Sequence, residues 1–265
     1  MPDSWRPRLG FAITSQPRPH LDRLAARVEA LGYDELWSND THEGSGLATL
    51  AGCAGATRRI ALGVGVIGLS ERDPGPIVEE IRRLRLPLDR LVVGLGSGRS
   101  RSLEVVRDGV IGLRELLPGT PIAMAAIGPR MCRLAGEIGD VVLLNWATAD
   151  RIVWSRDRVG EGAAAAGRPT PVLAAYVRVA IGPRARRRLA EETARYGASP
   201  AYRRAFADQG ADGRGIGIAC RSAKNVAEAL GPYRDVLDTT IVRGLPASDG
   251  ADAWLEIAEA AAPGR

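Results

Sequence analysis

One junction decides the fold: Leu31-Gly32-Tyr33-Asp34-Glu35-Leu36-Trp37-Ser38. Apolar residues at helical spacing over residues 21–31 stop at Gly32, and a strand-like run follows Asp34 at once. The segment Ile138-Gly139-Asp140 repeats this order of helix, glycine, acidic residue and strand. Glycine readily takes the left-handed conformation that ends many helices. Both glycines are therefore predicted to end a helix in that conformation, directly before a strand.

Eight short β-rich runs continue the pattern, at residues 9–13, 35–38, 60–67, 91–95, 122–126, 141–144, 172–181 and 239–242. Helical stretches separate them at residues 21–31, 47–57, 76–84, 103–117, 129–138, 149–166 and 184–195, with further helices at 200–207, 223–236 and 251–262. Such alternation is typical of a parallel sheet. The sequence predicts an α/β fold, a (β/α)8 TIM barrel, formed by residues 1–265 as a single domain. A Rossmann-type sheet is the alternative, but no Gly-x-Gly-x-x-Gly turn follows the first run.

The composition is that of a globular protein, with 45% hydrophobic and 25% charged residues. Cys53, Cys132 and Cys220 are widely spaced and fit neither a disulfide framework nor a zinc site. No apolar stretch approaches the roughly 20 residues of a membrane helix. Residues 1–6 lack the apolar core of a signal peptide. We therefore expect a cytoplasmic protein with no membrane partner.

The net charge is +5, and arginine supplies almost all of the positive charge. The basic runs at residues 184–188 and 203–204 raise the question of nucleic-acid binding. Few aromatic residues accompany them, so platforms for stacking bases are not evident. A solvated helix face is the favoured interpretation, and no nucleic-acid partner is expected. A positive field would also suit an anionic coenzyme.

Function in such a barrel lies in the loops that follow the strands. After the fifth predicted strand, Ala126-Ile127-Gly128-Pro129-Arg130 opens a helix. Gly128 permits close backbone approach, and Pro129 suits a first helical turn. The free amides of that turn, at the positive end of the helix dipole, suit a phosphate, and Arg130 would add a charged donor. An ordinary, well-capped loop is the alternative.

Glycines also mark the third and fourth predicted strands. The fourth ends in Gly94-Leu95-Gly96-Ser97-Gly98-Arg99, and the third reads Leu62-Gly63-Val64-Gly65-Val66. Glycine in or after a strand indicates that another surface, such as a flat ring, approaches the backbone. A tight turn and the curvature of the barrel are the respective alternatives.

Polar side chains follow the second predicted strand in Ser38-Asn39-Asp40-Thr41-His42-Glu43. They include one of only two histidines and several groups able to handle protons. The other histidine, His20, is expected to have a surface or capping role. No nucleophile triad stands out, and two distant histidines do not build a metal cluster without several carboxylates. We expect no metal.

Taken together, these segments resemble the luciferase-like monooxygenase family of flavin-dependent and deazaflavin F-420-dependent oxidoreductases. The matching segments are residues 30–40, 56–66, 89–98, 127–130 and 134–140, which recur in family order. The resemblance implies a coenzyme, deazaflavin F-420 or alternatively FMN. Its phosphate would lie at Gly96, Ser97 and Gly98 and at the turn formed by Ala126, Ile127, Gly128, Pro129 and Arg130. The backbone of Gly65 and Val66 would support the ring, where relatives often carry a non-proline cis peptide.

Two departures from the family matter. Its deazaflavin dehydrogenases often carry Asp-His after the second strand and Glu after the fourth, where this chain has Asp40-Thr41 and Arg99. The acid–base pair that oxidises a sugar hydroxyl is therefore missing, and His42 lies one residue further along. Relatives also carry a long insertion between strands four and five, where this chain has one helix. The shorter cover predicts a more open pocket.

The leading hypothesis is a reductase that transfers hydride from reduced F-420 to a C=C or C=N bond of a bulky small-molecule or peptide-like substrate. Asp40, Thr41, His42 and Arg99 are the candidate catalytic groups, and Asp40 is also assigned to the coenzyme site. The alternatives are an FMN-dependent monooxygenase and a non-catalytic relative that binds a coenzyme or a partner. Because relatives are often dimers, a homodimer is left open.

Overall fold

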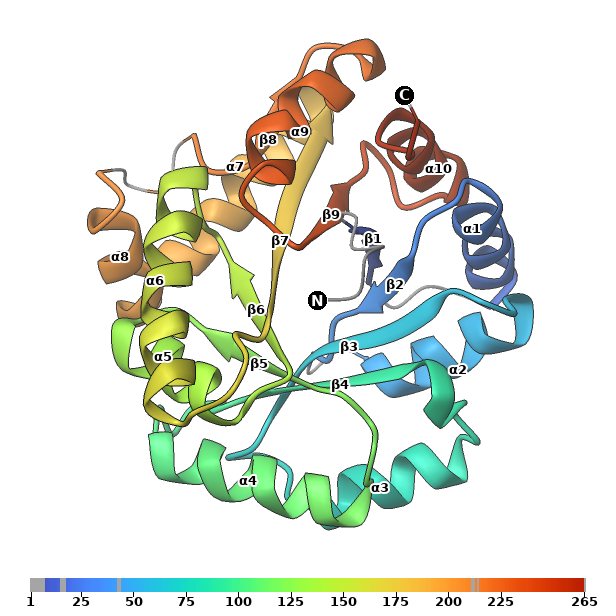
Figure 1. Cartoon of the computed structure of the whole chain (residues 1–265). Helices are drawn as coiled ribbons and strands as arrows, with labels where there is room; N and C mark the ends of the chain where they lie inside the picture. Colours follow the sequence, from blue (N-terminus) through green and yellow to red (C-terminus); the bar gives the residue numbers. More distant parts are fainter. Residues whose placement is uncertain (1–7, 15–17, 42–43, 211–212, 214, 265) are drawn as a thin grey trace.

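The computed structural model describes residues 8–14, 18–41, 44–210, 213 and 215–264. Eight parallel strands close into a barrel surrounded by helices (Figure 1). Its strands are β1 (Arg8–Ile13), β2 (Glu35–Ser38), β3 (Ala61–Gly68), β4 (Leu91–Gly96), β5 (Ile122–Ala126), β6 (Val141–Asn145), β7 (Val172–Ile181) and β9 (Thr239–Leu245). The strands pair in chain order, and β9 closes the ring between β7 and β1. The predicted TIM barrel is confirmed.

All ten predicted helices are present. They are α1 (Arg18–Ala30), α2 (Gly46–Ala56), α3 (Pro74–Arg83), α4 (Leu103–Leu116), α5 (Pro129–Ile138), α6 (Ala149–Ala165), α7 (Gly182–Gly197), α8 (Pro200–Ala207), α9 (Val226–Arg234) and α10 (Ala251–Ala260). Short 3-10 turns precede β4 (η1, Leu88–Arg90) and α9 (η2, Ala223–Asn225). Within the described part of the chain, no helix combines the length and the apolar character needed to cross a bilayer.

One strand was not predicted. β8 (Ile218–Cys220) pairs only with the far end of β7, outside the closed barrel. It has three residues and follows a glycine-rich stretch, so it carries no periodic pattern that could reveal it.

The acidic residues at the helix-to-strand junctions hold neighbouring strands together. The Asp34 carboxylate accepts a hydrogen bond of 3.0 Å from the amide of Leu9 in β1. Asp140 does the same for Ile122 in β5, and Asp238 for Leu173 in β7, over 2.9 and 2.7 Å. Each carboxylate therefore holds the start of the neighbouring strand in place, which explains why an acidic residue recurs at these junctions.

Gly32 and Gly139, which end the helices before β2 and β6, have different roles. Gly32 has φ +85°, so its predicted left-handed conformation is confirmed. The same prediction is wrong for Gly139, which is extended with φ −83°. A Cβ atom on Gly139 would lie 2.8 Å from the Ala135 carbonyl oxygen and 3.0 Å from the Met124 sulfur. Close packing, not backbone conformation, requires glycine there.

Of three buried apolar clusters in the described part of the chain, two form the layers of the barrel and the third lies around Trp146, Phe206 and Ile216. The larger layer lies between the strands and the surrounding helices, and a smaller one fills the barrel around Trp37, Leu143, Tyr176 and Ile241. A Cβ atom on Gly63 would overlap the ring of Trp37. This glycine therefore makes room for a large inward side chain, as the curvature interpretation expects.

The interior carboxyl of Glu35 gives a prediction on pH. Burial raises its pKa, against the opposing effects of a 2.7 Å hydrogen bond from Trp37 Nε1 and of Arg8. The contribution of this group to the free energy of unfolding is fully present below its pKa in the unfolded chain. It is lost as the pH rises through its pKa in the folded protein. Since Gln keeps the acceptor without the charge, Glu35→Gln should have a higher free energy of unfolding than the wild type near pH ~8, and the gain should shrink toward pH ~4.

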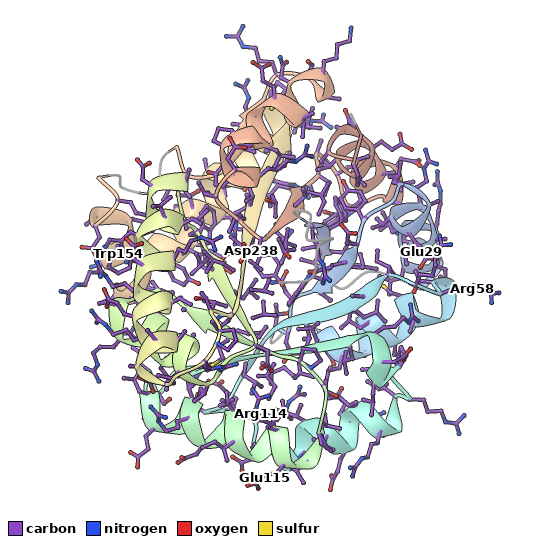
Figure 2. All side chains as sticks on the ribbon, viewed as in Figure 1. Glu29, Arg58, Arg114, Glu115, Trp154 and Asp238 are labelled. Atoms are coloured by element: carbon purple, nitrogen blue, oxygen red, sulfur yellow. The ribbon has the colours of Figure 1, made fainter. Side chains whose placement is uncertain are left out.

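Glu29, beside Arg58 at the periphery of the barrel, is the matched control (Figure 2). Burial opposes its charge, but the amides of Arg58, Arg59 and Ile60 donate to its carboxylate and give a net lowering of its pKa. Its stabilisation is therefore present at neutral pH and lost in acid. Urea denaturation should show Glu29→Gln destabilised near pH ~7, opposite to Glu35→Gln; equal pH trends in the two variants would contradict at least one of the two assignments.

Candidate functional site

A cavity of about 1070 Å³ opens at the carboxyl ends of the barrel strands. Its walls come from the ends of β1, β2, β3, β5, β6, β7 and β9 and from α7 and α8. This is the face on which TIM-barrel proteins carry their active sites. The volume is at the upper end of the roughly 300–1,000 Å³ of small-molecule and cofactor sites.

The structure brings together six of the predicted site residues, which line this cavity: Asp40, Thr41, Gly65, Val66, Ala126 and Ile127. Gly128, Pro129 and Arg130 continue from the Ile127 wall into α5. Gly96, Ser97, Gly98 and Arg99 do not line the cavity. His42 lies outside the described residues.

The loop after β2 is fixed by hydrogen bonds. The Asp40 carboxylate accepts a bond of 2.8 Å from the amide of Gly46, where α2 begins, and lies 3.8 Å from Arg72. Asn39 donates from Nδ2 to the Gly65 carbonyl over 2.9 Å. Its Oδ1 is buried and has no hydrogen-bond partner among the residues that the structure describes. Asn39, which was not predicted as a site residue, therefore presents a free acceptor at the cavity wall.

The floor of the cavity at β3 has the backbone that the resemblance implies. The peptide bond between Gly65 and Val66 is cis. The Tyr176 hydroxyl donates a 3.4 Å hydrogen bond to the Gly65 carbonyl, and a Cβ atom on Gly65 would overlap that hydroxyl. Glycine is required here by the Tyr176 side chain, independently of any ligand.

The turn between β5 and α5 leaves its amides free. Gly128 is the N-cap, no side chain caps the helix, and Pro129 occupies the first turn. A Cβ atom on Gly128 would meet nothing within 4 Å. Arg151 donates to the Ile127 carbonyl over 3.0 Å while its guanidinium lies 3.7 Å from the Trp154 ring centre. Arg151 thus fixes the turn through the Ile127 carbonyl, while the space around the Cβ position of Gly128 is open.

The loop after β4 packs against the neighbouring loop between β3 and α3. Gly98 has φ +61°, and a Cβ atom on it would overlap the Glu71 carboxylate. The Arg99 amide donates to Ser70 Oγ over 2.8 Å, and its side chain is 79% exposed. These features fit the alternative interpretation, in which the glycines form a tight turn. Arg99 does not line the cavity that Asp40 and Thr41 line. A role for Gly96, Ser97 and Gly98 at a phosphate stays a prediction.

A buried charged cluster, which was not predicted from the sequence, forms the opposite wall of the cavity. Arg178 bonds to Glu192 over 3.1 Å, donates to Asn145 and stacks on Trp146, while Arg243 lies beside this pair. Burial lowers the pKa of Arg243; Glu192 raises it and Arg178 lowers it further. A signal was available, because each arginine interrupts an apolar strand, VLAAYVRVAI and TTIVRGL. Charged residues are rarely buried without a partner.

Two tyrosine hydroxyls complete the polar lining. Tyr202 Oη accepts a 2.8 Å hydrogen bond from Asn145 Nδ2, and burial raises the pKa of both Tyr202 and Tyr176. Both hydroxyls therefore keep their protons at neutral pH. Across the described ranges, no cluster of three or more histidine, cysteine, aspartate or glutamate residues is arranged to hold a metal ion.

Comparison with known proteins adds three findings. The luciferase-like monooxygenase family model matches residues 8–110 and 110–248. The chain is 26% identical over 202 residues to 5,10-methylenetetrahydromethanopterin reductase of Methanolobus tindarius. That match covers 62% of this chain and 62% of the reductase, less than two thirds of its length.

Among the solved structures that share the fold are two with a coenzyme bound. One is an F-420-dependent secondary alcohol dehydrogenase in complex with an F-420–acetone adduct, with a TM-score of 0.75, 15% identity and coverage of 97% of this chain and 98% of the other. The second is the oxygenating constituent of 3,6-diketocamphane monooxygenase of Pseudomonas putida in complex with FMN, with a TM-score of 0.70, 15% identity and 97% coverage of both chains. At these identities, the likeness is one of fold.

Proposed function

This chain belongs to the luciferase-like monooxygenase family, and from that premise we propose that it is an oxidoreductase, a reductase that uses the deazaflavin coenzyme F-420. The proposed reaction adds hydride to a C=C or C=N bond of a bulky organic substrate. One observation carries the proposal: a single cavity joins a free buried acceptor, Asn39 Oδ1, to the Gly65–Val66 backbone and to the wall that leads into the uncapped α5 turn. The 26% identical reductase of Methanolobus tindarius supports the choice of reduction.

The residues present fit such a coenzyme. Asn39 Oδ1 is a buried acceptor without a donor, and buried polar atoms are rarely left so. A ring N–H would supply the donor. The open space in front of Gly128 leaves the first-turn amides of α5 accessible to a phosphate oxygen. Arg130, exposed in the same turn, adds a positive charge.

When bound, the reduced coenzyme supplies the hydride. The protein then has to orient the substrate, exclude water and provide a proton. Tyr202 Oη is well placed for the last task, because it accepts from Asn145 and its own proton stays on the oxygen at neutral pH. Asp40 and Thr41 line the same cavity and remain candidates, although the Asp40 carboxylate also accepts from the α2 amide of Gly46.

An FMN-dependent monooxygenase is the second candidate, favoured by the FMN-bound neighbour that shares the fold over 97% of the chain. Titration of the purified protein with both coenzymes separates the two. Quenching of F-420 fluorescence with no response to FMN supports the reductase. Binding of FMN alone, with oxygen uptake in the presence of reduced flavin, would replace it by the monooxygenase. Binding of neither would leave a non-catalytic relative.

Gly128→Val tests the phosphate turn. The N-cap backbone, φ −100° and ψ 167°, accepts valine, and the new side chain meets no protein atom within 4 Å at Cβ, so the fold is retained. The side chain would instead occupy the space in front of the amides. We expect the Kd for F-420 to rise about tenfold or more, a loss of about 1.4 kcal/mol per factor of ten.

Gly75→Val is the matched control, because Gly75, like Gly128, directly precedes a proline at the start of a helix and has nothing within 4 Å of its Cβ position. It does not line the cavity. Fluorescence titration should give the control wild-type affinity. An unchanged Kd in Gly128→Val would remove the α5 turn from the coenzyme site.

A further inference from the structure

Arg243 lies at the end of β9, between the main cavity and a second one. The second cavity has a volume of about 740 Å³ and is lined in part by His20, Leu245 and Trp254. The two cavities share Thr14, Glu192, Arg195 and Arg243. A ligand in either one reaches the same guanidinium.

The charge of Arg243 is buried, and no residue in the described part of the chain forms an ion pair with it. The residue is 8% exposed. Among the described residues, its guanidinium makes one hydrogen bond, from Nη1 to the neighbouring Gly244 carbonyl over 2.6 Å, and it lies 5.8 Å from the ring centre of Trp254. Among the residues that the structure describes, no carboxylate oxygen lies within 4.0 Å of it. Glu192, the buried carboxylate nearby, is already bonded to Arg178. Two buried cations thus share one buried anion.

The other charged residues that line the two cavities near Arg243 do not neutralise its charge. Arg188 and Asp249, on the wall of the second cavity, pair with each other at 2.8 Å. Glu191 is exposed to solvent. Arg195 is exposed as well and adds a further positive charge to both cavities. The buried part of the junction therefore keeps an excess positive charge.

A buried charge without a counter-charge is costly, so this arrangement is best explained by an anion that binds there. The planar guanidinium matches the two oxygens of a carboxylate or phosphate. The coenzyme phosphate is not that anion, because the α5 turn proposed to hold it follows β5, which Figure 1 shows on the other side of the barrel from β9.

We propose that Arg243 is a binding residue for an anionic oxygen group, a carboxylate or a phosphate, on the substrate. That this ligand is the substrate rests on the proposed reductase function; the anion site itself does not. The substrate class is then an unsaturated compound that carries an acidic group and reaches from the ring in the main cavity to the β9 wall.

Calorimetric titration of the full chain with inorganic phosphate and, separately, with benzoate tests the site. We expect the wild type to bind at least one of them, and its preference distinguishes a phosphate ester from a carboxylate as the recognised group. Arg243→Gln should weaken that binding by about tenfold or more, and Arg243→Lys, which keeps the charge without the fork, should fall between.

Arg187→Gln is the control, since it removes the same charge from an exposed position on α7 outside both cavities. It should bind like the wild type. Unchanged affinity in Arg243→Gln, equal loss in both variants, or no binding of either anion by the wild type would overturn the proposal. Retained F-420 binding in Arg243→Gln shows that the variant is folded.

Repeating the titration with saturating F-420 separates this proposal from the proposed function. Anion affinity that persists with the coenzyme bound supports a separate substrate subsite. Competition between the two would assign Arg243 to the coenzyme and overturn the substrate role. If the protein binds anions through Arg243 but no coenzyme, the anion site stands and the reductase function fails.

Discussion

Gly162→Ala should lower the free energy of unfolding by about 3 kcal/mol, although alanine is the better helix former. Gly162 in α6 and Gly136 in α5 face each other's helix backbones. A Cβ atom on Gly162 would overlap the Arg133 carbonyl oxygen, and one on Gly136 would overlap that of Val159. Backbone atoms cannot move aside as a side chain does, so the two helices would have to separate.

Gly160→Ala is a control of opposite sign in the same helix. A Cβ atom at Gly160 meets nothing within 4 Å, so only helix propensity acts, and a gain of up to about 1 kcal/mol is expected. Urea denaturation of both variants measures the difference. A Gly162→Ala protein as stable as Gly160→Ala would show that α5 and α6 are not in backbone contact.

The fold was largely predictable because its signals are local. Residues 31–38 contain a glycine in the left-handed conformation and an acidic residue that pins the next strand, and the structure shows both features. At the second junction, Gly139 is required for a different reason. It approaches Met124 closely, which only the tertiary packing reveals. β8 was missed because three residues that pair with one strand end carry no period.

The candidate site was predictable only where it is built from backbone. The loops after β2 and β5 and the Gly65-Val66 segment within β3 were identified from glycines and polar residues in or after strands, and they line the cavity. The charged wall was missed because its parts come from β7, β9 and α7, far apart in sequence. Only the fold brings Arg178, Glu192 and Arg243 together. Arg99 shows the converse, since a loop at the correct strand end directs its side chain into solvent.

Glu192→Gln is expected to be the most destabilising single-atom change at this wall, with a loss of about 3 kcal/mol. Glu192 is 7% exposed and is the partner of Arg178 at 3.1 Å. Glutamine keeps an acceptor for Arg178 Nε but removes the charge that offsets both guanidiniums. Two buried cations would then face each other with no buried anion between them.

Glu191→Gln provides the control, because Glu191 is the exposed neighbour on the same helix and its loss should change stability by less than about 0.5 kcal/mol. Chemical denaturation in a phosphate-free buffer and in a phosphate buffer gives the decisive comparison. If Arg243 is an anion site, phosphate should restore part of the stability lost in Glu192→Gln and stabilise Glu191→Gln no more than the wild type. A Glu192→Gln protein as stable as the control in both buffers would mean that the buried arginines need no counter-charge. Arg243 would then give no reason to expect an acidic substrate.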